Sequence, residues 1–182
     1  MEQEALQYFT ALQSGNEAEQ YYALGKLLEL LKKPVDWTYS VWERLVQNLS
    51  SSNSLKRSYA VQLLCALAAN SDPEERVLDD FAAIWAVTFD EAFPTAQKCI
   101  QSIWKIGLAG KAQRELVVAH LANRYVNCIE VKNCTLIRYN IIESLHKLYD
   151  ATGEMRLKEI SDSLIEKEND SENREKYASV WG

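Results

Sequence analysis

The sequence is poor in the two residue types that make turns, with only 6 glycines and 3 prolines among 182 residues. An all-β fold needs a turn about every ten residues and depends on these residue types, so their scarcity argues against one. There is also no stretch approaching 18 uncharged apolar residues, the length that a membrane-spanning helix needs. Hydrophobic residues nevertheless make up 47% of the chain and charged residues 25%, a composition typical of a folded globular protein.

An excess of basic residues is absent as well, because 20 Lys and Arg stand against 26 Asp and Glu, a net charge of −6. Proteins that bind the phosphate backbone rely on cationic side chains, so nucleic acid is not an expected partner. The first residues, Met1 to Glu4, lack the basic start and apolar run of a signal peptide. We therefore expect a cytoplasmic protein without a membrane attachment, whose cysteines are reduced thiols.

Histidine is scarce, with 2 residues, and cysteine is present at 4 positions. Cys65 and Cys99 lie in apolar helical patterns and are predicted to be small core residues. Cys128 and Cys134 flank a short loop and could be combined with His120 into a metal site, but their spacing matches no pair of zinc-ligand type. We predict no metal and no cofactor.

Motifs that carry catalytic chemistry are missing too. The chain contains no glycine-rich dinucleotide or phosphate-binding loop, no nucleophile elbow, no zinc-protease helix motif and no calcium loop. His120 and His146 are the only histidines, and neither has a partner at a catalytic spacing. The sequence therefore predicts no catalytic residues and a protein that is not an enzyme.

Apolar residues recur with a helical period along nearly the whole chain, as in Leu24, Leu27, Leu28 and Leu31. Helix-stopping and helix-starting residues interrupt this period, which predicts about nine or ten helices joined by short connections. Asp72 is an expected N-cap, with Pro73 at the first helical position and Glu75 completing a capping box. We thus expect a helix to begin directly after Asp72.

One type of helix repeats about every 36 to 42 residues, with a small residue followed by large aliphatic ones. Another amphipathic helix lies between successive copies, so the repeating unit is a helix pair. The aligned positions are Ala23, Leu27 and Leu30; Ala60, Leu64 and Leu67; Cys99, Ile103 and Ile106; Ile141, Leu145 and Leu148; and Tyr177 and Trp181.

With this period, the helix pair and the start Arg57-Ser58-Tyr59-Ala60, the chain resembles the HEAT-repeat and armadillo-like superfamily over about residues 17–181. The third unit departs from the pattern, because Ala96 stands where the basic residue would be. The resemblance implies an all-α fold, a right-handed α-solenoid of about four to five helix pairs, in a single domain over 1–182. The pairs would span roughly 1–33, 34–70, 72–109, 110–151 and 153–182. A plain helical bundle remains the alternative.

The resemblance also implies that the second helix of each pair faces a concave surface where partners bind. A stripe on these helices mixes aromatic and amide side chains, which is typical of partner-binding surfaces. Packing of the aromatic rings between units is the alternative explanation. The candidate binding residues are Tyr21, Gln62, Gln97, Gln101, Trp104, Tyr139, Glu143 and His146.

Negative charge is concentrated in residues 72–91, whose net charge of −6 equals that of the entire chain. The first acidic residues of this segment are explained by a helix start, where the helix dipole favours carboxylates. This explanation does not apply to Asp79, Asp80, Asp90 and Glu91. An acidic patch of these four would attract a basic partner; a solvated helix face is the alternative.

We therefore expect a non-enzymatic module that binds another protein, and one version of it is an immunity or antitoxin-like inhibitor of a basic protein. An enzyme on the same scaffold is an alternative, such as an alkylated-base DNA glycosylase that would use Trp104, Tyr139 and Glu143. A scaffold subunit of a larger complex is another. The sequence does not indicate the oligomeric state.

Overall fold

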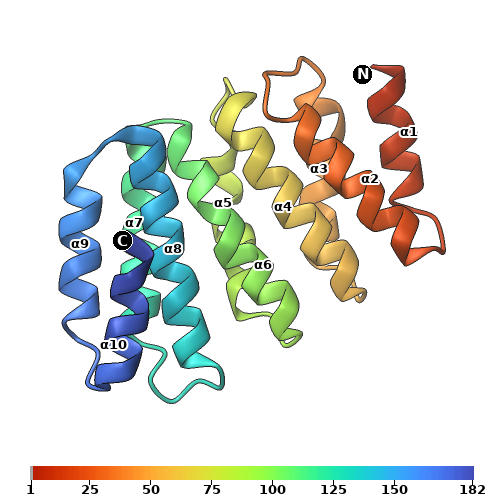
Figure 1. Ribbon diagram of the computed structural model, residues 1–182. Helices are drawn as coiled ribbons and strands as arrows, with labels where there is room; N and C mark the ends of the chain where they lie inside the picture. The colour runs from red at the N-terminus through yellow and green to blue at the C-terminus, as the bar shows by residue number, and fades with distance from the viewer. Residues whose placement is uncertain (1) are drawn as a thin grey trace. The chain divides into compact units, whose positions relative to one another are not determined.

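The computed structural model describes residues 2–182, and this part of the chain contains ten α-helices, three short 3-10 helices and no strand. The prediction of an all-α fold is confirmed. The chain divides into two compact units, Met1–Cys99 and Ile100–Gly182, and each contains paired helices (Figure 1). The helices that fall within the five predicted ranges are α1 and α2, α3 and α4, α5 and α6, α7 and α8, and α9 and α10, and the division into these five pairs stays a prediction. The single domain over 1–182 stays a prediction.

The first unit is built from helix pairs joined by short loops. It contains α1 (Gln3–Ala11), α2 (Glu17–Leu30), α3 (Thr38–Asn48), α4 (Ser54–Asn70), α5 (Arg76–Ala86), the 3-10 turn η1 (Val87–Phe89) and the beginning of α6 (Phe93–Ile103). Helix α1 packs on α2 and α3 packs on α4, while α2 and α4 also contact each other. The second helices α2 and α4 therefore lie side by side, as Figure 1 shows on the near side of this unit.

The second unit begins with the end of α6 and the 3-10 helix η2 (Trp104–Leu108). It continues with α7 (Lys111–Val126), α8 (Cys134–Thr152), α9 (Met155–Ile165), α10 (Ser171–Ala178) and η3 (Ser179–Trp181). Helix α8 is central, because η2, α7, α9, α10 and η3 all pack against it.

The repeated apolar positions form the core of both units. Twelve of the fourteen aligned residues are buried, and only Leu30 and Trp181 are partly exposed. Burial of a Leu or Ile side chain contributes about 2 kcal/mol, so this row of residues is a main source of the stability of the helix pairs. The predicted core role of Cys65 and Cys99 is also confirmed, because both thiols are fully buried.

Helix α5 begins later than the sequence predicts. Asp72 does cap the helix, but its carboxylate accepts hydrogen bonds from the N–H groups of Arg76 at 3.0 Å and Val77 at 2.9 Å. Glu75 does not complete a capping box, because it adopts a left-handed conformation with a φ of 54° directly before the helix. The segment from Pro73 to Glu75 is thus a turn that the Asp72 side chain spans, and the predicted helix start after Asp72 is wrong.

The expectation of four reduced thiols is also wrong for one pair. Cys128 and Cys134 form a disulfide, with Cα atoms 5.3 Å apart. The loop between α7 and α8 turns back on itself, which brings the two side chains together although they are six positions apart. Both sulfur atoms are therefore used in the disulfide, and neither cysteine is free to bind a metal ion together with His120.

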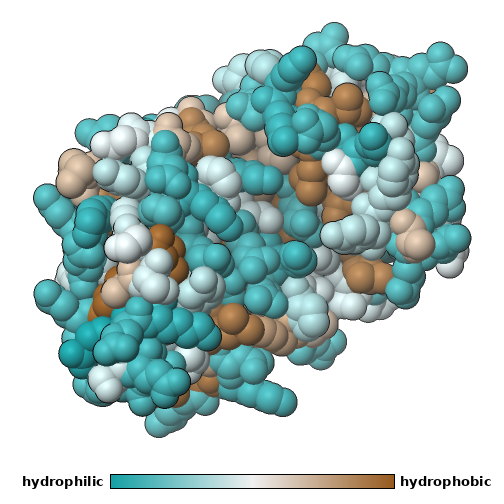
Figure 2. Space-filling model, in the orientation of Figure 1, coloured by the Kyte–Doolittle hydropathy of each residue, from teal (hydrophilic) through white to brown (hydrophobic). Residues whose placement is uncertain are grey.

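No helix among residues 2–182 combines the length and the apolar character needed to cross a membrane. Figure 2 shows a mainly hydrophilic face, on which hydrophobic residues appear as small separate patches.

Candidate partner-binding groove

The second helices of the first unit enclose a groove of about 500 Å³. Helices α2 and α4, the start of α6 and the residue before it supply its walls. Aromatic, aliphatic and amide side chains all contribute. The lining residues are Tyr21, Leu24, Gly25, Leu28, Ser54, Leu55, Ser58, Tyr59, Gln62, Ala92, Pro94, Thr95, Gln97 and Lys98.

The starts of the helices around the groove are fixed by side-chain caps. Asn16 accepts hydrogen bonds from the N–H groups of Ala18 and Glu19 at the start of α2, and Asn53 caps α4 through the N–H groups of Leu55 and Lys56. Each such cap contributes about 1 kcal/mol. The groove is therefore built on defined helix ends.

An ion pair joins α4 to the loop that precedes α6. Arg57 donates two hydrogen bonds to Asp90, from Nε at 2.6 Å and Nη2 at 2.8 Å. Asp90 also accepts a bond from the N–H of Ala92, and Thr95 donates its hydroxyl to the carbonyl of Ser54 at 3.1 Å. These bonds hold the starts of α4 and α6 together, at one wall of the groove.

Tyr21 is the most exposed aromatic residue of the groove. Its exposed fraction of 71% contrasts with that of Tyr59, which is 9% exposed and forms part of the groove floor. Burial raises the pKa of Tyr59, and the neighbouring Glu17 and Tyr21 raise it further, so Tyr59 is a neutral phenol at physiological pH. A tyrosine that is mostly exposed beside apolar residues is suited to contact a partner.

Gly25 leaves an opening in the middle of α2. Apart from the neighbouring backbone of its own helix, a Cβ atom at this position would meet no atom within 4 Å, so neither close packing nor a special backbone angle requires a glycine. Glycine within a helix costs about 0.5–1 kcal/mol relative to alanine. The fold therefore gains nothing from this residue, while the groove gains space.

Two of the predicted amides also lie in the groove. The side-chain nitrogen of Gln62 donates to the carbonyl and the hydroxyl of Ser58, at 3.1 and 3.2 Å. Gln97, on α6, also lines the groove and is partly exposed. Together they place hydrogen-bonding groups beside the apolar residues Leu28 and Leu55.

The structure therefore brings together three of the eight predicted stripe residues, namely Tyr21, Gln62 and Gln97. The other five belong to the second unit. Gln101 donates to Asn140 at 2.9 Å, and the indole N–H of Trp104 donates to the carbonyl of Gln101.

The remaining members of the stripe are on α8 and are partly exposed: Tyr139, Glu143 and His146. The ammonium of Lys176 lies 5.3 Å from the ring centre of Tyr139. The rings of His146 and Trp181 pack edge to face at 4.6 Å. In this unit the aromatic residues thus contact α10 and η3 of the same chain, which is the packing role that the sequence left open.

The acidic residues of the 72–91 segment are not equivalent. Asp90 is 5% exposed at its side chain and is paired with Arg57, whose hydrogen bonds lower the pKa of Asp90. Asp80 accepts the indole N–H of Trp42 at 2.7 Å. The expectation that these two carboxylates lack a structural role is wrong, whereas Asp79 and Glu91 are exposed on the surface.

Several groove residues were not singled out from the sequence. Leu55, Pro94 and Thr95 lie in the first turns of α4 and α6, and Lys98 lies in the next turn of α6. A signal for them was available, because both helices follow clear breaks in the apolar period. Aligning the first turns of the second helices would have singled out Leu55, Pro94 and Thr95.

The described part of the chain contains no cluster of three or more His, Cys, Asp or Glu residues arranged to hold a metal ion. The second unit has a groove of its own, of about 480 Å³, between α7 and α9. Its apolar floor includes Val118 and Leu157, and its rim carries Arg114 in an ion pair of 2.9 Å with Glu154.

Comparison with known proteins shows the fold. No protein-family model matches the chain, and no curated protein matches it. Two crystal structures of engineered proteins, both targets of the Northeast Structural Genomics Consortium, are similar in structure. The first has a TM-score of 0.54 at 16% identity, over 99% of this chain and 78% of the engineered one. The second has a TM-score of 0.53 at 15% identity, over 98% of this chain.

This chain spans about half the length of the second engineered protein, 47%. At these identities the likeness carries no information on binding or activity. It shows that the chain has a helical-repeat fold made of helix pairs.

Proposed function

We propose that this chain is a non-enzymatic protein-binding module of the HEAT and armadillo-like type, which holds a segment of another protein in the groove of its first unit. Gly25 is the observation that carries the proposal. A glycine that destabilises its own helix and is not required by packing is explained by a bound segment that needs the space.

The lining of the groove indicates the chemistry of the partner segment. Tyr21 and Leu55 are exposed to 71% and 36% and offer apolar contact area. Gln62 and Gln97 offer amide groups that can bond to a polypeptide backbone. We infer that the segment has at least one large apolar side chain and that it is bound mainly by apolar contacts and hydrogen bonds.

Binding of a partner in the groove and binding of a basic protein by the acidic patch would respond differently to salt. Lys98 is the charged residue that lines the groove, so binding there should depend weakly on ionic strength. Binding through Asp79 and Glu91 would weaken strongly with salt, because exposed charges are screened over about 10 Å at 0.1 M. Asp80 and Asp90 are engaged within the fold, which supports the groove.

Photo-crosslinking tests the proposal with two adjacent tyrosines. Tyr21 lines the groove, whereas Tyr22, with an exposed fraction of 60%, is on the same helix outside it. A photoreactive phenylalanine analogue is placed at position 21 or 22, and each variant is irradiated in a lysate of the native host at low salt or at 0.5 M salt. We expect a discrete crosslinked protein from position 21 that is lost in Gly25→Trp and is retained at 0.5 M salt.

The two positions also define the results that contradict the proposal. Equal crosslinking from 21 and 22 would show that the groove is not the contact surface. A crosslink that disappears with salt and with Asp79→Asn would favour the acidic surface. Recovery of nucleic acid from position 21 would instead favour the glycosylase alternative.

A further inference from the structure

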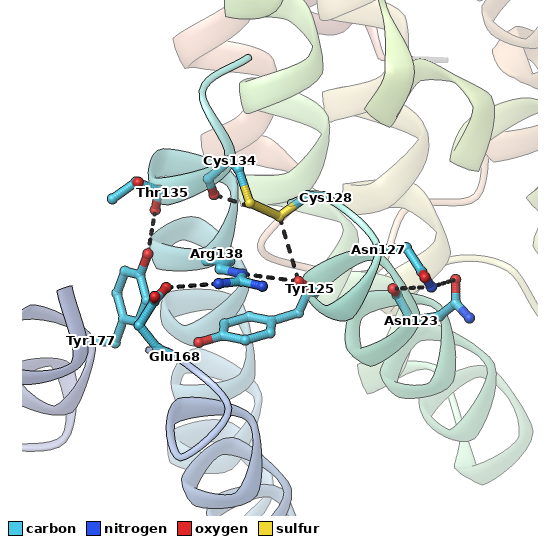
Figure 3. Close-up of a disulfide and its surroundings, with 9 residues drawn as sticks. All are labelled: Asn123, Tyr125, Asn127, Cys128, Cys134, Thr135, Arg138, Glu168 and Tyr177. Carbon is cyan, nitrogen blue, oxygen red and sulfur yellow. Dashed lines mark hydrogen bonds and ion pairs between the residues drawn. A yellow bond between two sulfur atoms is a disulfide. The ribbon is translucent and has the colours of Figure 1, made fainter. Parts of the chain in front are cut away.

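Three links converge on the first turn of α8, in the second unit (Figure 3). The disulfide ties Cys134 to Cys128 at the end of α7. Arg138 connects the same turn to the end of α7 and to the loop before α10, and Tyr177 connects it to α10 itself. The disulfide is the one link among these three that a redox reaction can open.

The start of α8 has no side-chain cap within the described chain. Its N-cap residue, Asn133, is in a left-handed conformation with a φ of 67°, and its side chain does not bond to the helix. The first N–H groups of a helix otherwise need such a partner to stay ordered. The disulfide instead ties Cys134, the first residue of the helix, covalently to Cys128.

Arg138 and Glu168 form a buried ion pair of 2.7 Å. Arg138 also donates Nε to the carbonyl of Tyr125 at 3.0 Å. Burial alone would raise the pKa of Glu168, but the N–H of Asp170 and the guanidinium of Arg138 lower it, so the carboxylate is ionised. This pair links the first turn of α8 to the chain that leads into α10.

Tyr177 attaches α10 to the same turn. Its ring is fully buried, and its hydroxyl donates to the carbonyl of Thr135 at 3.2 Å. Burial raises the pKa of Tyr177 to about 12, which keeps the hydroxyl protonated as a donor. The position of α10 therefore depends on Thr135, the residue directly after Cys134.

We propose that the Cys128–Cys134 bond is a reversible redox site, and that its reduction by a dithiol loosens the first turn of α8 and the docking of α10 on it. Cys134 is partly exposed and Cys128 is buried, so the sulfur of Cys134 is the point of attack. The proposal concerns the second unit and does not depend on the groove of the first.

The reaction balances as a thiol–disulfide exchange. One thiolate of the dithiol bonds to Cys134 Sγ, the disulfide breaks, and the Cys128 sulfur leaves with the electron pair and takes up a proton. The second thiol of the reductant then displaces Cys134, whose sulfur is also protonated. The protein gains two hydrogen atoms, and the reductant becomes a disulfide.

The surroundings accommodate both oxidation states. Cys128 Sγ lies 3.5 Å from the carbonyl of Tyr125 and 3.8 Å from that of Cys134, so a reduced thiol has an acceptor in place. The two cysteines are six positions apart and remain neighbours after reduction, which allows the bond to form again. The loop between them carries Ile129, with an exposed fraction of 74%, and gains freedom when the bond opens.

Lys132 within the loop offers a direct test with trypsin. Cleavage after Lys132 produces two pieces that the disulfide holds together, so the oxidised, nicked chain should migrate at full length without reductant. The untreated protein is compared with protein in dithiothreitol. We expect reduction to speed cleavage after Lys132 by roughly tenfold or more, because the loop opens more often.

Amide hydrogen exchange of the same samples measures how reduction of the disulfide affects the helices. Exchange in residues 134–138 and 171–178 should accelerate by a similar factor, while α4 in the first unit is the internal control and stays unchanged. The double variant Cys128→Ser/Cys134→Ser should match the reduced protein and be insensitive to dithiothreitol.

Three outcomes would overturn the proposal. Mass spectrometry of the air-oxidised protein could find both thiols free, which would contradict the bond itself. Dithiothreitol could fail to reduce the folded protein, which would make the bond a permanent link. Reduction could also leave cleavage and exchange unchanged, and the bond would then not control α8 and α10.

Discussion

Gly25 lines the groove, and the packing of its helix does not require a glycine there. Replacing it with alanine adds a Cβ that meets no atom within 4 Å apart from the neighbouring backbone of its own helix and removes the helix penalty of glycine. We expect Gly25→Ala to raise the free energy of unfolding by about 0.5–1 kcal/mol, measured by urea denaturation. An unchanged or lower stability would mean that the glycine is needed by the fold after all.

Asp90 and Asp79 are two acidic residues of the same segment with different environments. Asp90→Ala leaves Arg57 without its buried partner and should lower the free energy of unfolding by about 2 kcal/mol. Asp79→Ala removes an exposed carboxylate and should change it by less than about 0.5 kcal/mol. Similar effects of the two substitutions, measured by denaturation at pH 7, would contradict the assigned roles.

The Arg57–Asp90 pair also predicts a pH dependence. The pKa of Asp90 is lowered in the folded protein, so its stabilising contribution is complete above the unfolded pKa of about 4. The contribution is lost as pH falls through the lower, folded value. The difference in stability between wild type and Asp90→Ala should therefore shrink below pH 4; a difference that grows as pH falls would have the wrong sign.

Individual contacts of this kind lie beyond sequence reasoning. Arg57 could be recognised as the basic residue that opens a repeat, but its partner is 33 positions away, and no periodicity links the two. The disulfide was missed for a different reason. The expectation of a cytoplasmic protein favoured reduced thiols. The close approach of Cys128 and Cys134 in the α7–α8 loop could not be predicted from the residue types of the loop.

At the scale of a helix, the start of α5 depends on one side chain. Asp72 accepts the N–H groups of Arg76 and Val77 across the Pro73–Glu75 turn. Asp72→Ala should reduce the free energy of unfolding by about 1 kcal/mol, the usual contribution of a cap. Asp72→Asn should lose less, because it keeps one of the two oxygens that accept these bonds. Thermal denaturation of both variants tests this, and an Asp72→Ala variant as stable as wild type would contradict the capping role.

Helix periods were predicted well, and helix starts less well. Apolar spacing identified the buried faces because burial follows the 3.6-residue period. The capping box at Asp72 failed because the same residues also form a turn, and a left-handed Glu75 ended the turn. Local sequence favoured both arrangements, and tertiary packing selected the later start.

At the scale of the whole molecule, the repeat was the strongest prediction. The aligned core positions recur because each helix pair buries its apolar face against the next one. The same alignment placed Tyr21, Gln62 and Gln97 in one groove. It did not show that Tyr139 contacts Lys176 and that His146 contacts Trp181, because the sequence pattern does not predict where the last helix pair packs.

The most direct test of the groove is an affinity measurement with the crosslinked partner once it is identified. Binding to wild type, Gly25→Ala and Gly25→Trp is compared by titration calorimetry, with Lys26→Trp as the control for a bulky residue outside the groove. We predict a dissociation constant within about twofold of wild type for Gly25→Ala and Lys26→Trp, and at least about tenfold weaker binding for Gly25→Trp, a loss of about 1.4 kcal/mol. Wild-type affinity of folded Gly25→Trp would contradict the proposal that the partner occupies this groove.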